Sequence, residues 1–341
     1  MSTTSPLQET THTFTFTYDR PLKCTATKFY HTATPEHDGI TLLFVTGVGL
    51  DQGVWVPTIR ELFRLARQPN STLKINSAWL FERPNHGDPA LMNAEELKNY
   101  TEIFLSWQYG AAIHALITSD KFTDAERSRL FAITFSGGSA SFVQTLRWLY
   151  ERDGRPITLK GLIFVESPYL DPSDQPSFEA VYPTIKKLTE YRRRNWASVE
   201  EAVKWFRSRI PWKEFHPDVW EVFAATSFCQ DPQHPDRVIF KTPPEQEYLS
   251  FLTDGSSFES LPYLRTIWDK FPLHLILGGK RDFWPELQGA MKSNIERDRK
   301  HFKTVTVVDG VGHYIPAVKP YELANHVFNI LSSEVKSNPK L

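Results

Sequence analysis

Short runs of apolar and β-branched residues recur along the chain, and each ends in a cluster of turn residues. The runs are 40–45, 75–81, 130–135, 159–165, 273–277 and 303–308. Run 40–45 is typical of a strand buried on both faces of a parallel sheet, run 159–165 predicts another buried strand, and the other runs predict further strands. Helical spacing fills most of the intervals, and a capping box formed by Asn93 and Glu96 predicts one long helix to about Ser119. Strands that alternate with helices predict an α/β fold with a mostly parallel sheet.

Two regions depart from this alternation. Residues 12–30 alternate with period two on both sides of a turn, which predicts an N-terminal antiparallel hairpin. Residues 167–262 are rich in proline, tryptophan and arginine, and they show helical spacing without a strand of the buried kind. We therefore predict a core made of residues 1–166 and 263–341, with a helical cap inserted at 167–262.

The run 130–135 ends abruptly in Ser136, Gly137 and Gly138, after which helical spacing resumes. A strand that reverses so sharply into a helix needs small residues around the turn. Thr134 stands where the G-x-S-x-G pattern has its first glycine, so the match is degenerate. At such a turn the serine hydroxyl projects above the sheet, and the Gly137 amide can donate to an oxyanion. A glycine-rich helix entry without chemistry is the alternative interpretation of this stretch alone.

Further polar residues follow the other predicted parallel strands, whose carboxyl ends meet at one edge of the sheet. They include Asp282 and His313. A serine becomes a nucleophile when an imidazole takes its proton, and a carboxylate fixes the tautomer of that imidazole. We predict Ser136 as the nucleophile, His313 as the base and Asp282 as the acid. Glu166, at the end of run 159–165, is the alternative acid, or else a helix-capping or cap-hinge carboxylate. Ser139, one turn into the helix, is a distant alternative nucleophile.

The loop after run 40–45 supplies a second oxyanion donor, because the amide of Val48 is placed to join that of Gly137. This loop lacks the residues and the spacing of a phosphate-binding loop. His86 and Asp88 have no partner at metal-binding spacing, and we interpret them as turn structure. Neither a cofactor nor a metal is expected.

These motifs resemble those of the α/β-hydrolase fold superfamily over residues 12–335. Residues 310–320 are similar to the family's Gly-x-Gly-His segment with its downstream Lys-Pro. Residues 278–282 resemble the Gly-x-x-Asp acid loop, and residues 81–87 the Asp-x-x-Gly-x-Gly stretch. Thr46 replaces the usual histidine of the His-Gly oxyanion segment. The resemblance implies an α/β-hydrolase fold with a cap. More loosely, the chain is similar to fungal hydrolases of toxin biosynthesis and to peroxisomal lipase-like hydrolases.

The composition of the chain argues against several classes of protein. The 341-residue chain has a net charge of −1 and 40% hydrophobic residues, which is typical of a globular protein and does not favour nucleic-acid binding. No run reaches the roughly 18 apolar residues of a membrane span, and residues 1–10 lack the pattern of a secretory signal. The two cysteines, Cys24 and Cys229, suit a reducing compartment. Pro339-Lys340-Leu341 keeps the basic residue and the leucine of a peroxisomal signal, so we expect a cytoplasmic or peroxisomal protein that is not secreted.

Taken together, these patterns predict a cofactor-independent serine hydrolase that cleaves an ester or thioester of a mostly apolar acyl group. One alternative is an acyltransferase, cyclase or lyase of secondary metabolism that uses the same acyl-enzyme. Another is a catalytically silent member of the fold that binds a small ligand. A serine nucleophile argues against the epoxide hydrolases and dehalogenases of this fold, which use aspartate. The oligomeric state carries no prediction.

Overall fold

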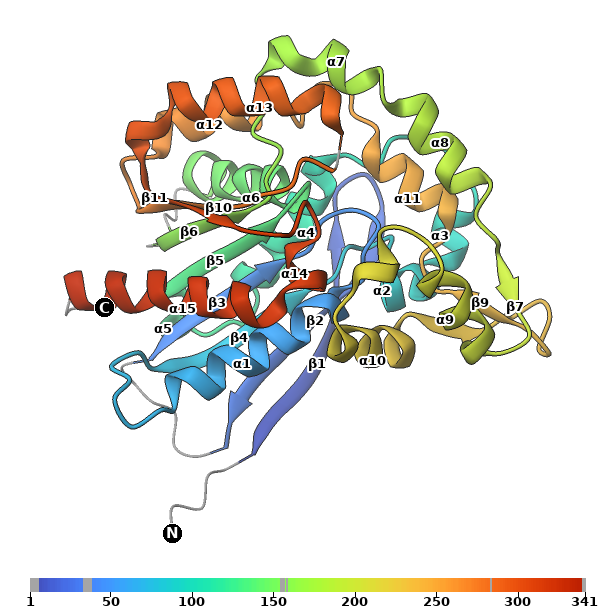
Figure 1. The fold of residues 1–341 in the computed structure, drawn as a ribbon, viewed down its shortest axis with the longest axis horizontal. Helices are drawn as coiled ribbons and strands as arrows, with labels where there is room; N and C mark the ends of the chain where they lie inside the picture. The colour runs from blue at the N-terminus through green and yellow to red at the C-terminus, as the bar shows by residue number, and fades with distance from the viewer. Residues whose placement is uncertain (1–5, 33–38, 154–156, 158, 283, 339–341) are drawn as a thin grey trace.

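The computed structural model describes residues 6–32, 39–153, 157, 159–282 and 284–338. In this part of the chain the central sheet has eight strands, in the order β1-β2-β4-β3-β5-β6-β10-β11 (Figure 1). The parallel strands are β3 (Ile40–Val45), β4 (Ile75–Phe81), β5 (Leu130–Phe135), β6 (Leu159–Val165), β10 (Leu273–Gly278) and β11 (Phe302–Val308). Strands β1 (Leu7–Thr17) and β2 (Pro21–His31) pair antiparallel. The mostly parallel sheet and the N-terminal hairpin are therefore confirmed.

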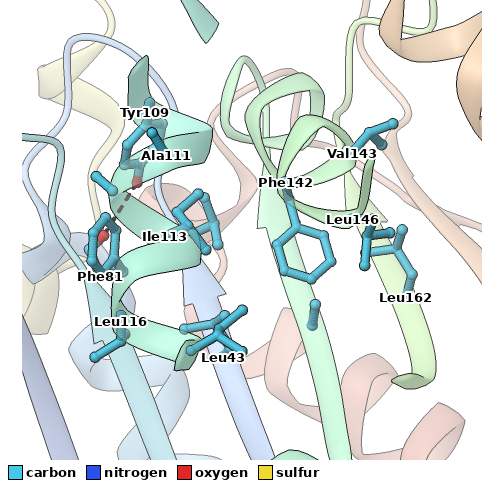
Figure 2. Packing of buried hydrophobic residues seen from close by; sticks show 14 of the residues in the cluster. Leu43, Phe81, Tyr109, Ala111, Ile113, Leu116, Phe142, Val143, Leu146 and Leu162 are labelled. Carbon is cyan, nitrogen blue, oxygen red and sulfur yellow. Dashed lines mark hydrogen bonds between the residues drawn. The ribbon is translucent and has the colours of Figure 1, made fainter. Parts of the chain in front are cut away.

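Helices bury both faces of this sheet. Successive side chains of a strand point to opposite sides, so each strand contributes to the apolar clusters on both faces. Leu43 and Val45 face one apolar cluster, whereas Leu42 and Phe44 face the other. The first face carries α4 (Ser106–Thr118), α6 (Gly138–Arg147), α12 (Ser260–Ile267) and α13 (Pro285–Arg297), and the second carries α1 (Val56–Ala66) and α15 (Pro320–Ser337). Figure 2 shows side chains of α4 and α6 packed over the strands of the first face. Each such leucine or phenylalanine contributes about 1.5–3 kcal/mol by leaving water.

The single long helix predicted from Asn93 is wrong. Helix α2 (Gly87–Met92) ends just before Asn93, the short helix α3 (Ala94–Lys98) follows it, and α4 begins only at Ser106. The Asn93 side chain makes no cap. Instead its amide nitrogen donates to the backbone oxygen of Lys23, and its oxygen accepts from the Lys23 nitrogen, both at 2.8 Å. The asparagine therefore joins this loop to the N-terminal hairpin, a contact that local sequence does not reveal.

Residues 167–262 contain the helices α7 (Gln175–Glu179), α8 (Tyr182–Glu190), α9 (Val199–Arg207), α10 (Pro217–Thr226) and α11 (Pro244–Phe251). They also contain a small antiparallel sheet that the sequence did not predict: β7 (Asn195–Trp196), β9 (Val238–Phe240) and β8 (Phe228–Gln230). Strands of two or three residues are too short for a periodic pattern. Phe206 lies at the centre of an aromatic cluster here, with Trp196 and Phe240 among its neighbours. The division into core and cap stays a prediction.

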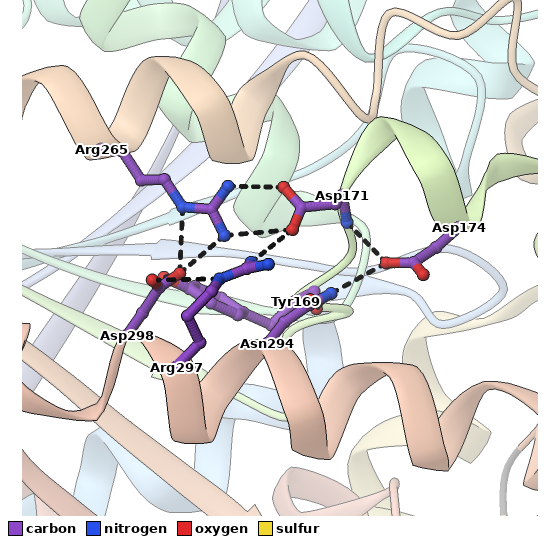
Figure 3. Close-up of polar contacts among 7 residues, drawn as sticks. All are labelled: Tyr169, Asp171, Asp174, Arg265, Asn294, Arg297 and Asp298. Carbon is purple, nitrogen blue, oxygen red and sulfur yellow. Dashed lines mark hydrogen bonds and ion pairs between the residues drawn. The ribbon is translucent and has the colours of Figure 1, made fainter.

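An ionic network joins the start of this region to the helices beside it (Figure 3). Asp171 accepts from Arg265 of α12 and from Arg297 of α13. Arg265 also contacts Asp298 at 2.7 Å, and Tyr169 donates to the same carboxylate at 3.1 Å. Although burial opposes ionisation, the two arginines lower the pKa of Asp171. The network therefore fixes the segment that follows β6.

Candidate active site

Ser136 lies in the turn between β5 and α6, with a φ angle of 51° in the left-handed region. Non-glycine residues rarely take this conformation. The turn is also crowded, because a Cβ added to Gly138 would lie 2.5 Å from the Thr46 oxygen. Thr134, which replaces the first glycine of the G-x-S-x-G pattern, is buried, and its hydroxyl oxygen lies 2.8 Å from that of buried Ser139 in a hydrogen bond. Ser139, the alternative nucleophile, therefore has a structural role in this turn.

His313 follows β11 and lies against the serine. Its Nε2 atom is 3.0 Å from the Oγ atom of Ser136, and its Nδ1 atom is 3.2 Å from Oε2 of Glu166. Both His313 and Glu166 are 7% exposed, so little water competes for these contacts. Three strands thus bring a hydroxyl, an imidazole and a carboxylate into one hydrogen-bonded chain. This arrangement can transfer a proton from the serine while the carboxylate holds the imidazole.

Glu166 reaches this position from a strained turn immediately after β6, where its φ angle is 47°. Its second oxygen, Oε1, accepts a hydrogen bond of 2.5 Å from the backbone nitrogen of Gly278, the last residue of β10. The backbone nitrogen of Glu166 donates to the oxygen of Ile276 on the same strand. These contacts fix the carboxylate at the seam between two neighbouring strands.

Asp282 occupies a different place from the one expected for the acid. Its Oδ1 atom accepts from the backbone nitrogen of His313 at 3.1 Å, and the residue is exposed. The carboxylate also lies against the backbone of Gly312, where an added Cβ would be 1.9 Å from Oδ1. The structure therefore places Glu166, the alternative acid, at Nδ1 of the imidazole. Both strands end beside His313, and sequence order alone did not tell which loop turns toward the ring.

A cavity opens over the serine. Ser136, His313 and the predicted oxyanion pair Val48 and Gly137 line it. A Cβ added to Gly137 would lie 3.4 Å from the Val48 side chain, so the two loops are in contact. Apolar side chains also line it, among them Phe178 of α7, Phe251 of α11 and Leu287 of α13. The structure brings all the predicted site residues to this edge of the sheet, with Asp282 at the backbone of His313.

His86 holds the loop after β3, which carries Val48. The Nε2 atom of His86 accepts from the Gly49 nitrogen at 3.1 Å, and its Nδ1 atom lies 3.0 Å from Oδ1 of Asn85. Complete burial, reinforced by the charge of Arg83, holds the pKa of His86 well below its usual value. The histidine is therefore neutral and carries its proton on Nδ1. Asp88 pairs with Lys241 at 2.6 Å.

Two further observations bear on the other expectations. Within the described ranges, no three histidine, cysteine, aspartate or glutamate side chains form a group able to hold a metal ion. No helix in the same part of the chain is long and apolar enough to cross a membrane. The tripeptide Pro339-Lys340-Leu341 lies outside the described residues.

Arg83 is the charged residue of the cavity wall that the sequence patterns did not single out. It lies in the turn after β4, lines the same cavity as Ser136, and is only 2% exposed. Its guanidinium carbon lies 4.3 Å from the centre of the Tyr109 ring. The available signal was a cation two residues after a buried apolar strand, inside the segment 81–87.

No protein-family model matches the chain, and no curated protein matches it in sequence. Among solved structures, the chain is similar to the peroxisomal α/β-hydrolase Lpx1 of Saccharomyces cerevisiae, with a TM-score of 0.72 and 15% identity over 96% of this chain and 90% of that one. It is similar to the Mycobacterium tuberculosis esterase Rv0045c, with a TM-score of 0.60 and 14% identity over 96% and 93%. It is also similar to a thioesterase domain from the curacin biosynthetic pathway, with a TM-score of 0.61 and 14% identity over 93% and 99%.

The similar structures include a haloalkane dehalogenase from Bradyrhizobium elkani as well. The chain therefore has the α/β-hydrolase fold, as its motifs predicted. One fold carries several chemistries in these proteins, so the activity must be argued from the site itself.

Proposed function

We propose that this protein is a serine hydrolase that cleaves an ester or thioester of a mostly apolar acyl group. The observation that carries the proposal is the chain of contacts from Ser136 Oγ to His313 Nε2, at 3.0 Å, and from His313 Nδ1 to Glu166, at 3.2 Å. An alcohol paired with a base is the machinery of acyl transfer. The esterase and the thioesterase among the similar structures support this choice.

In the proposed mechanism Ser136 attacks the carbonyl carbon of the substrate while its proton passes to Nε2 of His313. The amides of Val48 and Gly137 stabilise the oxyanion of the tetrahedral intermediate. Glu166 stabilises the imidazolium and fixes its orientation. His313 then gives the proton to the leaving alcohol or thiol, and an acyl-enzyme remains. Water, activated by the same imidazole, releases the acid and restores the serine.

We assign Glu166, in place of Asp282, as the acid. This assignment follows from the position of its carboxylate at the ring nitrogen that does not face the serine. We assign Asp282 as a positioning residue, because its hydrogen bond with the backbone nitrogen of His313 fixes the backbone from which the imidazole extends. Two carboxylates on adjacent strand ends thus share the task of holding one histidine.

Labelling with a fluorophosphonate tests the nucleophile directly. We expect stoichiometric modification of the wild type at Ser136, found by peptide mass spectrometry, and none in Ser136→Ala. Ser139→Ala is the matched control, since Ser139 is buried and bonded to Thr134. A panel of aryl esters and acyl thioesters should show that Ser136→Ala loses about 10⁶-fold in kcat, as in removal of a triad serine. Labelling that persists in Ser136→Ala would refute the proposal.

For location, we propose the peroxisome or the cytoplasm. The C-terminal Pro339-Lys340-Leu341 supports the first, and the structural similarity to a peroxisomal hydrolase adds weak support. Fusing the last ten residues of the chain to a fluorescent protein in a fungal cell tests the signal. Punctate fluorescence that overlaps a peroxisomal marker is the expected result, and diffuse fluorescence would leave the cytoplasm.

A further inference from the structure

Arg83 is a buried cation in the wall of the substrate cavity. Among the residues that the structure describes, its Nε and Nη1 atoms have no hydrogen-bond partner, and no carboxylate forms an ion pair with it. Burial lowers the pKa of Arg83 to about 10, so the side chain remains charged at neutral pH. A buried charge without a partner destabilises the folded protein. We therefore looked for a ligand group that would pair with this charge.

The surroundings of Arg83 do not offset this destabilisation. The ring of Tyr109 supports the guanidinium, but an aromatic ring accepts no ordinary hydrogen bond from its N–H groups. Glu82, the adjacent acid, directs its oxygens to the backbone nitrogens of Gln52 and Arg83, at 2.7 and 3.2 Å. Its burial, with the nearby charge of Asp51, raises the pKa of Glu82 well above the usual value. Both Glu82 oxygens are thus engaged by backbone nitrogens, and within the described residues neither forms an ion pair with the guanidinium.

A second unpartnered donor lies in the same wall. Ser106, the first residue of α4, lines the cavity, and within the described residues its buried hydroxyl has no hydrogen-bond partner. Ser106 and Tyr109 are three residues apart on one helix, so they share a face. The hydroxyl and the guanidinium that stacks on Tyr109 therefore belong to one side of the cavity. The rest of the lining named above is largely apolar.

These donors are separated from the nucleophile across the sheet edge. Arg83 follows β4 and Ser136 follows β5, and β3 lies between these two strands. Two strand spacings amount to about 10 Å. A ligand group at Arg83 therefore belongs to the far end of an acyl chain whose carbonyl lies at Ser136.

We propose that Arg83, with Ser106 beside it, binds a carboxylate at the far end of the acyl group, so that the substrates are half-esters or half-thioesters of dicarboxylic acids. The planar guanidinium matches a carboxylate in a two-pronged contact. The inference rests on the proposed function for the position of the carbonyl. A carboxylate fits better than a phosphate, because one cation in an apolar wall balances a single negative charge.

Binding without turnover tests this assignment independently of catalysis. In the Ser136→Ala variant, calorimetry should show monomethyl suberate binding about 10- to 100-fold tighter than neutral methyl octanoate, the range expected of charge-assisted hydrogen bonds. Adding Arg83→Met should abolish this preference, and adding Arg83→Lys should restore part of it. Arg60→Met is the matched control, since Arg60 is an exposed arginine on the opposite face of the sheet, in α1. Equal affinity for the two esters in Ser136→Ala would overturn the proposal, whether or not Arg83→Met folds.

A kinetic arm separates the two proposals. The ratio of kcat/KM for para-nitrophenyl hydrogen suberate to that for para-nitrophenyl octanoate should fall by about 10- to 100-fold in Arg83→Met. This fall should appear in KM, as expected for lost binding. Hydrolysis of both esters at equal rates by the wild type would overturn the carboxylate site and leave the serine hydrolase intact. If ester binding depends on Arg83 but fluorophosphonates do not label the protein, the carboxylate site stands and the serine hydrolase proposal is overturned.

Discussion

Strands β6 and β10 are neighbours in the sheet, and each ends in a carboxylate beside His313, yet the two ends are built differently. Glu166 follows β6 immediately, is buried, and reaches the imidazole through a left-handed turn. Asp282 lies four residues beyond β10, is exposed, and holds the backbone of the histidine. The comparison teaches that a strand end supplies a position for an acid, while the turn decides where the carboxylate points.

Glutamine at position 166 gives the sharpest test of the comparison. Glu166→Gln should lower kcat by about 10⁴-fold, because an amide favours the wrong imidazole tautomer, as in the equivalent substitution of a protease triad. Initial rates on an aryl ester measure the loss. Asp282→Asn is the control, and it should lose far less because the amide oxygen can still accept from the His313 nitrogen. The sequence alone predicts the opposite order, so a larger loss in Asp282→Asn would return the acid role to that residue.

A smaller effect should follow from displacing the second carboxylate without deleting it. Gly312→Ala places a Cβ 1.9 Å from Oδ1 of Asp282, so the carboxylate must move away from the His313 backbone. We expect Gly312→Ala and Asp282→Ala each to lower kcat/KM by about 10- to 100-fold, the loss expected when the support of a catalytic group is removed. Because both changes break one contact, the double variant should lose no more than the single ones. Additive losses would show that Asp282 acts elsewhere.

A buried titratable side chain also follows β4, where His86 is held neutral. In the folded state its pKa lies well below the usual value, so between pH 6.5 and that pKa the unfolded chain binds more protons. The contribution of His86 to stability is therefore complete above pH 6.5, and it falls by about 1.4 kcal/mol for each pH unit below that value. His86→Gln keeps an acceptor for the Gly49 nitrogen without a titrating ring. Between pH 7.5 and 5.5, the free energy of unfolding in urea should fall less in His86→Gln than in the wild type. An equal fall in both proteins would contradict the prediction.

Most of the fold could be predicted because the inner strands of the sheet, such as β3 and β5, are buried on both faces. Run 130–135 matches β5, and run 159–165 matches β6, since a strand covered by helices on both sides must be apolar throughout. The small sheet of residues 195–240 gave no such signal. The break at Asn93 was hidden because its partner, Lys23, is distant in sequence.

The candidate site was predictable in its residue types and only partly in its geometry. Ser136 and His313 follow strands in short turns, so their meeting follows from the topology. The choice between Glu166 and Asp282 depended on backbone angles that no motif in the sequence expresses. Arg83 was missed because a charged residue in a turn usually faces water, and its burial depends on α4 packing above it.

The left-handed backbone at Ser136 and Glu166 has an evolutionary consequence. Each of these residues costs about 1–2 kcal/mol that glycine would not cost. A lineage selected for stability alone would therefore gain by replacing both, and with them the nucleophile and its acid would disappear. Descendants of this chain that no longer need the reaction should show glycine or asparagine first at these two positions, while the buried strands beneath them stay unchanged.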